Sequence, residues 1–388
     1  MKTLLALVCI CIFALPVLAE SPHVAFPNGL SPEATYFPIG VWLQNPANAV
    51  RYKEAGINLY IGLWQGPTDE QLDQLKAQDI RVICGWNQTA QRRMDDPVFA
   101  GWMHQDEPDN AQPVTDPQTG KQSYGPPVKP ETIVADYEEM KQRDPTRPIF
   151  LNLGQGVAND EWVGRGPGAQ LSDYETYIKG CDIVSYDIYP ITDLRREDGE
   201  DYLWLIAKGL DRLTRWTDGE KPIWNVIECT HINNPNQKPT PNQVKSEVWM
   251  SLIHGSKGII YFVHEFQPKF NEKALLDDPQ MLEAVTAINQ QIHTLAPILN
   301  QPSLPEGITV ESSNPEVPIA FMAKEFEGAL YLFAINMRNI PVSATFSFKQ
   351  SIQAIEDMEE ERTIPISQQQ ITDTFSPYQV RMYKGKTD

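Results

Sequence analysis

Residues 57–86 read INLYIGLWQGPTDEQLDQLKAQDIRVICGW, and this stretch contains the unit that decides the fold. Ile57–Leu63 and Ile80–Gly85 are short apolar runs of the kind that form buried strands. Between them, Thr68–Gln78 carries apolar residues at helical spacing, and its Thr-x-x-Gln start is the pattern of a capping box. The stretch therefore predicts a strand, a helix and a second strand, and the nearly continuous apolar character of both runs favours parallel strands covered by helices.

The same alternation of apolar runs and amphipathic stretches continues from Phe37 to about Leu299. Eight runs are expected to be strands: Phe37–Leu43, Ile57–Leu63, Ile80–Gly85, Phe99–His104, Pro148–Leu153, Asp182–Ile188, Ile223–Ile227 and Gly258–Val263. Helices are expected at Asn48–Ala55, Thr68–Gln78, Gln88–Met94, Pro130–Arg143, Ser172–Ile178, Asp201–Thr217, Asn242–Gly255 and Pro279–Ala296. Eight such units in a row indicate either a (β/α)8 barrel or a doubly wound sheet. The count favours the barrel, and no G-x-G-x-x-G motif follows the first strand, which weakens the alternative of a dinucleotide-binding sheet. We therefore predict an α/β protein with a (β/α)8 TIM barrel over residues 20–300.

From about Leu304 onward the pattern changes to short segments that alternate like antiparallel strands. These segments are Ile308–Ser312, Ile319–Glu325, Ala329–Ile335, Val342–Phe348 and Gln379–Tyr383. They predict a small C-terminal antiparallel β-sandwich domain over residues 301–388. Its expected role is to pack against the barrel. Within the barrel, the segment Asn110–Lys129 is rich in Pro and Gly and is expected to be a long loop, and loops of this length are often functional.

The first nineteen residues have the pattern of a signal peptide. Lys2 supplies the positive charge, Leu4–Leu15 is apolar, and Val17-Leu18-Ala19 fits the small-x-small rule for cleavage. The apolar run is shorter than the ~20 residues that a membrane span needs. We therefore expect cleavage after Ala19, a secreted or periplasmic mature chain, and no membrane association after cleavage.

Charge and cysteine content narrow the classes of partner. The chain has 388 residues and a formal net charge of −19, so the basic surface by which proteins bind nucleic acids is not expected. Three cysteines remain after the signal peptide, at positions 84, 181 and 229. Three thiols cannot all pair within one chain, and their spacing matches no zinc motif. We expect Cys84, Cys181 and Cys229 to be buried small apolar residues.

Active sites of (β/α)8 barrels lie at the carboxyl-terminal ends of the strands. The side chains just past the predicted strands are rich in carboxylates, amides and tryptophans, which are the groups that bind and cleave sugars. The candidate substrate-binding residues are Trp42, Trp64, Trp86, Asn87, His104, Asp106, Asn152, Tyr186, Tyr189, His231, His264 and Glu265. The three tryptophans follow three consecutive strands, which indicates a platform for sugar rings. The alternative is that they fill the mouth of the barrel as core residues.

Two of these strand ends resemble a known group of enzymes. The segment Gly101-Trp-Met-His-Gln-Asp-Glu-Pro-Asp109 resembles the fourth-strand motif of clan A retaining glycoside hydrolases, in which an Asn-Glu-Pro or a close variant ends the strand. A second glutamate ends the seventh strand in that clan, and here Ile223-Trp-Asn-Val-Ile-Glu228 ends the seventh predicted strand. Asp106 stands where the clan has Asn, and an ionised Asp can only accept hydrogen bonds.

This resemblance implies a reaction and roles for particular residues. Glu107 would be the acid/base and Glu228 the nucleophile of a retaining double displacement, with Tyr186 or Tyr189 hydrogen-bonded to Glu228. The substrate would be a β-linked poly- or oligosaccharide, and no cofactor or metal would be required. The family within the clan is not assigned, because the resemblance covers the barrel motifs alone.

Two other functions are compatible with the sequence. A metal-dependent barrel hydrolase could use His104, Asp106, His231 and His264 as ligands, since such sites favour imidazole with carboxylate. However, the first strand lacks the His-x-His that metal-dependent amidohydrolase barrels usually carry. A non-catalytic glycan-binding protein on a glycosidase barrel is the second alternative. Loss of either glutamate would favour it, and both glutamates are present.

Overall fold

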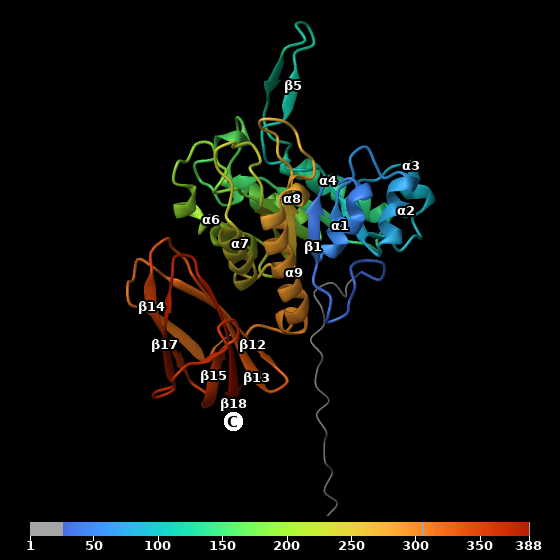
Figure 1. Cartoon of the computed structure of the whole chain (residues 1–388). Coiled ribbons are helices and arrows are strands. Elements are labelled where there is room, and N and C mark those ends of the chain that lie inside the picture. The colour runs from blue at the N-terminus through green and yellow to red at the C-terminus, as the bar shows by residue number, and fades with distance from the viewer. Residues whose placement is uncertain (1–25, 305, 388) are drawn as a thin grey trace, which may run out of the picture.

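The computed structural model describes residues 26–304 and 306–387, so the predicted signal peptide lies outside the described residues. Figure 1 shows a barrel surrounded by helices and a smaller β-domain on one side of it. Between residues 26 and 304, eight strands close into a barrel in the order β1-β10-β9-β8-β7-β4-β3-β2, and all neighbours in it are parallel. These strands are β1 (Ile39–Trp42), β2 (Leu59–Ile61), β3 (Arg81–Cys84), β4 (Phe99–Met103), β7 (Ile149–Leu153), β8 (Ile183–Asp187), β9 (Ile223–Glu228) and β10 (Ile259–Phe262). Each lies on one of the eight predicted runs, and the predicted TIM barrel is confirmed.

Helices follow the strands and cover the outside of the barrel. They are α1 (Ala49–Glu54), α2 (Asp69–Ala77), α3 (Gln88–Arg92), α4 (Pro130–Arg143), α5 (Tyr174–Tyr177), α6 (Leu205–Trp216), α7 (Pro241–Ile253), α8 (Ala274–Asp277) and α9 (Pro279–Leu299). Short 3-10 turns occupy Pro46–Asn48, Gln155–Val157, Val163–Arg165, Leu171–Asp173, Ile178–Gly180 and Gly199–Tyr202. The predicted capping box of α2 is present, because the side chain of Thr68 accepts from the amide of Gln71 and the side chain of Gln71 accepts from the amide of Thr68. Thr240 and Gln243 form the same box at the start of α7.

The barrel has two apolar layers, and strand geometry separates them. Successive side chains of a strand point to opposite faces. Phe150, Trp224 and Ile260 fill the inside of the barrel, whereas their strand neighbours Leu151 and Ile259 belong to the larger layer between strands and helices. This alternation also decides which side chains at the strand ends reach the mouth.

One segment departs from the predicted unstructured loop. Within Asn110–Lys129, strands β5 (Pro113–Thr115) and β6 (Gln122–Tyr124) pair as an antiparallel hairpin. Figure 1 shows this hairpin projecting away from the barrel. All six residues of the two strands are exposed, so the hairpin is held by its own ladder and turn, and burial contributes little to its stability.

Residues 306–387 form the predicted β-sandwich. A sheet in the order β11-β14-β17 faces a second sheet in the order β12-β13-β18-β15-β16, and both contribute to one apolar core. The strands are β11 (Ile308–Ser312), β12 (Ile319–Phe326), β13 (Ala329–Asn336), β14 (Val342–Phe348), β15 (Ile352–Asp357), β16 (Arg362–Thr363), β17 (Gln370–Phe375) and β18 (Val380–Thr387). Sequence patterning missed β15, β16 and β17, because their outward positions are polar and few apolar residues mark the inward ones.

Helix α7 joins the two domains. The ring of Trp249 stacks on Phe333 at 5.2 Å between centroids, and the hydroxyl of Ser246 donates to the carbonyl of Tyr378 at 2.8 Å. Lys245 and Glu359 add an ion pair at the edge of this contact. The β-domain is thus packed on the barrel through one long, largely buried helix.

The remaining predictions on composition can be placed in the structure. Cys84, Cys181 and Cys229 are buried and unpaired, which confirms their prediction as small core residues. Among the helices of the described residues, none combines the length and the hydropathy that a membrane span requires.

The N-cap of α7 provides a test of the fold. Thr240→Ala removes the side-chain acceptor for the amide of Gln243 and should lower the free energy of unfolding by about 1 kcal/mol. Thr240→Ser keeps that acceptor and should stay within a few tenths of a kcal/mol of the wild type. Urea unfolding followed by circular dichroism measures both variants, and equal losses in the two would contradict the capping assignment.

Candidate active site

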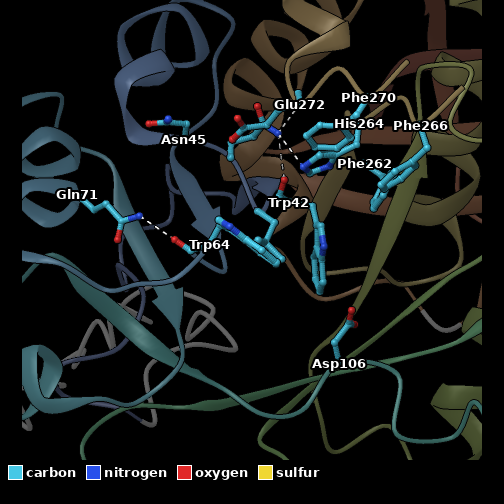
Figure 2. Close-up of a pocket in the computed structure, with 12 residues that line it drawn as sticks. Trp42, Asn45, Trp64, Gln71, Asp106, Phe262, His264, Phe266, Phe270 and Glu272 are labelled. Carbon is cyan, nitrogen blue, oxygen red and sulfur yellow. Dashed lines mark hydrogen bonds between the residues drawn. The ribbon is translucent and has the colours of Figure 1, made fainter. Parts of the chain in front are cut away.

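A cavity of about 640 Å³ opens at the carboxyl-terminal end of the barrel strands, where the sites of such barrels lie. Most of its lining follows strands β1, β2, β4 and β10, and Figure 2 shows these residues around the opening. They are Trp42, Leu43, Gln44, Asn45, Trp64, Gln71, Asp106, Phe262, His264, Phe266, Phe270 and Glu272. The cavity therefore combines an aromatic side with at least two carboxyl groups.

The aromatic side is built mainly from the segment that follows β10. His264 lies parallel to Phe266 and to Phe270, with ring centroids about 6 Å apart in both pairs. Across the opening, the ring of Trp64 is 69% exposed and that of Trp42 is buried. Exposed aromatic rings beside a cavity are typical of a binding surface, and their flat apolar faces suit the C–H faces of sugar rings.

His264 is fixed as a neutral ring. The side-chain amide of Gln44 donates to Nε2 of His264 at 3.3 Å and to the carbonyl of Glu272 at 2.7 Å, while its oxygen accepts from the hydroxyl of Tyr52 at 2.6 Å. Burial lowers the pKa of His264 to about 4. The ring is therefore uncharged near neutral pH and serves as a hydrogen-bonding and stacking surface rather than as a proton donor.

A cluster of carboxyl groups lies at the ends of the neighbouring strands β4, β7 and β8. The amide of Asn152 donates to Oδ1 of Asp106 at 3.1 Å. The hydroxyl of Tyr189 donates to Oδ2 of Asp187 at 3.0 Å, and the carboxyl group of Asp187 lies close enough to that of Glu107 to feel its charge. Three acidic residues thus meet at one side of the barrel mouth.

Burial and like charges make these groups hold protons. The side chain of Asp106 faces the cavity, but the surrounding protein displaces water and, with the charge of Glu107, raises its pKa to about 7. Burial and the charge of Glu107 hold the pKa of Asp187 well above its usual range, so Asp187 holds its proton more tightly than a carboxyl group in water.

The backbone that carries Glu107 is unusual. Glu107 has a φ of 42°, in the left-handed region that is rare for a residue with a side chain. Its amide donates to the carbonyl of Asn152 at 3.0 Å. Two residues on, the buried carboxylate of Asp109 accepts from the amide of Gly154 at 2.9 Å and from the hydroxyl of Tyr174 at 2.7 Å. These contacts hold a strained turn in place, and such strain is often found at functional sites.

Glu228 lies in a different environment. It ends β9, is fully buried and does not line the cavity. Its Oε1 accepts from the amide of Ile191 at 2.7 Å, and its Oε2 accepts from the amide and the hydroxyl of Thr192 at 3.0 and 2.7 Å. Burial raises the pKa of Glu228 to about 7, although these hydrogen bonds lower it. Glu247 of helix α7 lies beside it, and burial and the charge of Glu228 hold the pKa of Glu247 well above its usual range.

Several predicted site residues lie behind the barrel wall instead of in the cavity. Trp86 packs against Trp102 at 4.7 Å between ring centroids, in the layer under the helices. Asn87 caps helix α3 and donates to the carbonyl of Pro67. The ring of His104 contacts the carbonyl of Ile133 on α4 at 3.2 Å, and the hydroxyl of Tyr186 donates to the carbonyl of Ile206 on α6.

His231 and Glu265 line a separate cavity of about 390 Å³. His231 is held there by the carbonyls of Asn234 and Gln237, each at 3.0 Å from Nδ1. The structure therefore keeps His104, His231 and His264 apart. Within the described residues, no group of three or more His, Cys, Asp or Glu side chains is arranged to hold a metal ion.

The structure also adds residues that were not predicted. Asp187, Gln44, Phe262, Phe266, Phe270 and Glu272 belong to the cavity or to the carboxyl cluster. Strand phase would have found Asp187, because Ile183 points into the barrel and every second residue after it does the same. The aromatic residues after β10 lie on an irregular segment, so no periodic pattern marks them.

The pKa of Asp106 leads to a pH test. A carboxyl group whose pKa is higher in the folded chain than in the unfolded chain takes up a proton on folding at any pH between the two values, so the folded state loses stability as the pH rises through that range. For Asp106 the range runs from the ordinary pKa of 3.8 to the folded-state pKa of about 7. As the pH rises through it, the wild type should lose stability relative to Asp106→Asn. Urea unfolding of both proteins at several pH values between 4 and 8 measures this difference. Parallel pH curves would contradict the assignment.

Comparisons with known proteins agree with this architecture. The family model of glycoside hydrolase family 42, described as beta-galactosidase, matches residues 130–289. This segment begins with α4, ends within α9 and contains both Asp187 and Glu228. No curated protein matches the sequence.

Solved structures share the fold. A variant of AmyP in complex with maltotriose is 9% identical with a TM-score of 0.53, over 91% of this chain and 98% of that chain. A putative alpha-galactosidase from Bacteroides fragilis is 12% identical with a TM-score of 0.52, over 93% and 81% of the two chains. An alpha-amylase from Lactobacillus plantarum is 11% identical with a TM-score of 0.51, over 90% and 99%. The closed barrel and the family match confirm the predicted resemblance to clan A, and the chain is a glycoside hydrolase of the (β/α)8-barrel type.

Proposed function

We propose that this enzyme hydrolyses a β-linked oligo- or polysaccharide in the cavity at the barrel mouth, with net retention at the anomeric carbon. The observation that carries this proposal is the arrangement of an aromatic wall beside a cluster of carboxyl groups, two of which, Asp106 and Asp187, have raised pKa values. Because the matching family model is described as beta-galactosidase, β-galactosides are the first substrates to examine.

Glu107 is proposed as the acid/base. It ends the motif that resembles the acid/base strand of clan A, and it lies in the carboxyl cluster next to the cavity. A general acid must hold a proton near the working pH. In the first step Glu107 protonates the leaving oxygen, and in the second it takes a proton from the attacking water.

The resemblance assigns the nucleophile to Glu228. For that role its carboxylate would have to leave Ile191 and Thr192 and reach the cavity, because three hydrogen bonds now hold both of its oxygens.

The location proposed for the enzyme is outside the cytoplasm, on the basis of the signal peptide pattern in residues 1–19. N-terminal sequencing of the exported protein would test the expected start at Glu20.

The first experiment is hydrolysis itself. The mature enzyme should release sugar from members of a panel of β-linked aryl glycosides and oligosaccharides, and its activity should persist in the presence of a chelator. Proton NMR of the first product should show the β-anomer before mutarotation. Loss of activity with chelator would favour the metal-dependent hydrolase, and binding without turnover would favour a glycan-binding protein.

Glu107→Gln should lower kcat/KM by about a hundred- to ten-thousandfold, because a positioned general acid contributes that much to rate. The loss should be smaller for aryl glycosides with a good leaving group, since these need little protonation. Gln105→Asn, a change at the exposed position two residues earlier, is the matched control. An unchanged rate for Glu107→Gln on a poor leaving group would exclude this role.

Trp64→Ala should raise KM by about fivefold and change kcat little, since stacking contacts of an exposed ring are worth about 1 kcal/mol. Trp86→Phe is the control, because Trp86 packs behind the barrel wall against Trp102. Steady-state kinetics on an oligosaccharide measures both. Equal effects of the two changes on KM would place Trp86 in the binding site after all.

A further inference from the structure

Asp187 has the position of a second reacting carboxylate. It is the last residue of β8, and its carboxyl group lies close enough to that of Glu107 to feel its charge. Between β8 and β4 lies only strand β7, whose Asn152 holds Asp106. The two carboxyl groups therefore project into the same side of the mouth from strands that are next-but-one neighbours.

Asp187 is also connected to the sugar-facing wall. Its Oδ2 accepts from the hydroxyl of Tyr189 at 3.0 Å, and the ring of Tyr189 packs on Phe262 at 5.3 Å between centroids. Phe262 lines the cavity. Tyr189 thus fixes the carboxylate of Asp187 at the edge of the space in which a sugar ring would lie.

Glu228 has the contacts of a structural anchor. Its two oxygens are occupied by three donors from Ile191 and Thr192, which lie on the same loop as Tyr189. Ile191 packs in the apolar layer under the helices, and Glu247 of helix α7 adjoins Glu228. These contacts occupy both oxygens of Glu228, so Glu228 holds the base of the loop that positions Tyr189 and Asp187.

We propose that Asp187, rather than Glu228, is the nucleophile that works with Glu107, an inference that rests on the proposed glycoside hydrolysis. In the reactive form Glu107 carries a proton and Asp187 is ionised. An oxygen of Asp187 forms a bond to the anomeric carbon as the bond to the leaving oxygen breaks, and the leaving oxygen takes the proton of Glu107. Water then bonds to the anomeric carbon and gives a proton to Glu107 as the ester bond to Asp187 breaks. The sugar lies between the two carboxyl groups, which retaining enzymes hold ~5–5.5 Å apart.

Covalent labelling of the wild-type enzyme tests the proposal directly. A 2-deoxy-2-fluoro glycoside with a good leaving group, made from the sugar that the enzyme cleaves, should accumulate as an ester on the nucleophile. Arg195, Arg196 and Lys208 separate Asp187 from Glu228, so trypsin places the two residues on different peptides. Mass spectrometry should find the added sugar on the peptide with Asp187, and sugar on Glu228 would overturn the proposal.

Variants provide a second measurement that does not depend on trapping. Asp187→Ala should lose at least a thousandfold in kcat, and azide should restore turnover and give the α-glycosyl azide from a β-glycoside. Glu228→Gln should keep kcat within about tenfold but melt at a lower temperature, because the amide nitrogen cannot accept from the loop. A folded Glu228→Gln with a thousandfold loss, or an Asp187→Ala of near wild-type rate, would overturn the proposal. Failure of the wild type to cleave any glycoside would instead refute the proposed function.

Discussion

Each barrel strand presents alternate side chains to the inside of the barrel and to the surrounding helices, and the active site depends on this alternation. Ile183 and Asp187 of β8 share the inward phase, while Tyr186 between them donates to helix α6. The same rule turns His104 toward α4. Nearness to the mouth alone therefore does not place a strand-end residue in the site. Inward parity favours such a place but does not ensure it, because Glu228 has the parity of Trp224 and Val226 and its oxygens are held by the loop after β8.

The inward positions gather acidic groups in a space from which water is partly displaced, and the protein compensates in two ways. Asp109 receives two hydrogen bonds from donors that are themselves buried, whereas Asp106 and Asp187 hold protons more tightly than in water. Keeping some of the carboxyl groups neutral limits their mutual repulsion. A raised pKa is also what an acid catalyst needs, so the electrostatic problem of the cluster and its chemical use have a common origin.

The sequence supported the architecture more fully than the site. Apolar runs of barrel strands are long, and Thr68 and Gln71 marked a helix start by local chemistry alone, so eight strands and the main helices were predicted at the right places. Trp42, Trp64, Asp106 and His264 were found at the cavity. Trp42 belongs to the inner layer of the barrel, and His264 has the same phase as Ile260 and Phe262. Trp86 was grouped with them by its place after a strand, without regard to phase. Phe266 and Phe270 could not be predicted, because tertiary contacts alone bring an irregular segment over the opening.

The hairpin of β5 and β6 bears on how such an enzyme can diversify. It begins at Pro113, six residues after Glu107, and all of its strand residues are exposed. The carboxylate of Asp116 satisfies the amides of its turn, so the hairpin needs no partner in the barrel. Lengthening such a connection has a small entropic cost, about 0.6 kcal/mol for each doubling. The rim of the barrel next to Glu107 can therefore be exchanged as a module, by recombination or by grafting, while the strands that aim the carboxyl groups stay as they are.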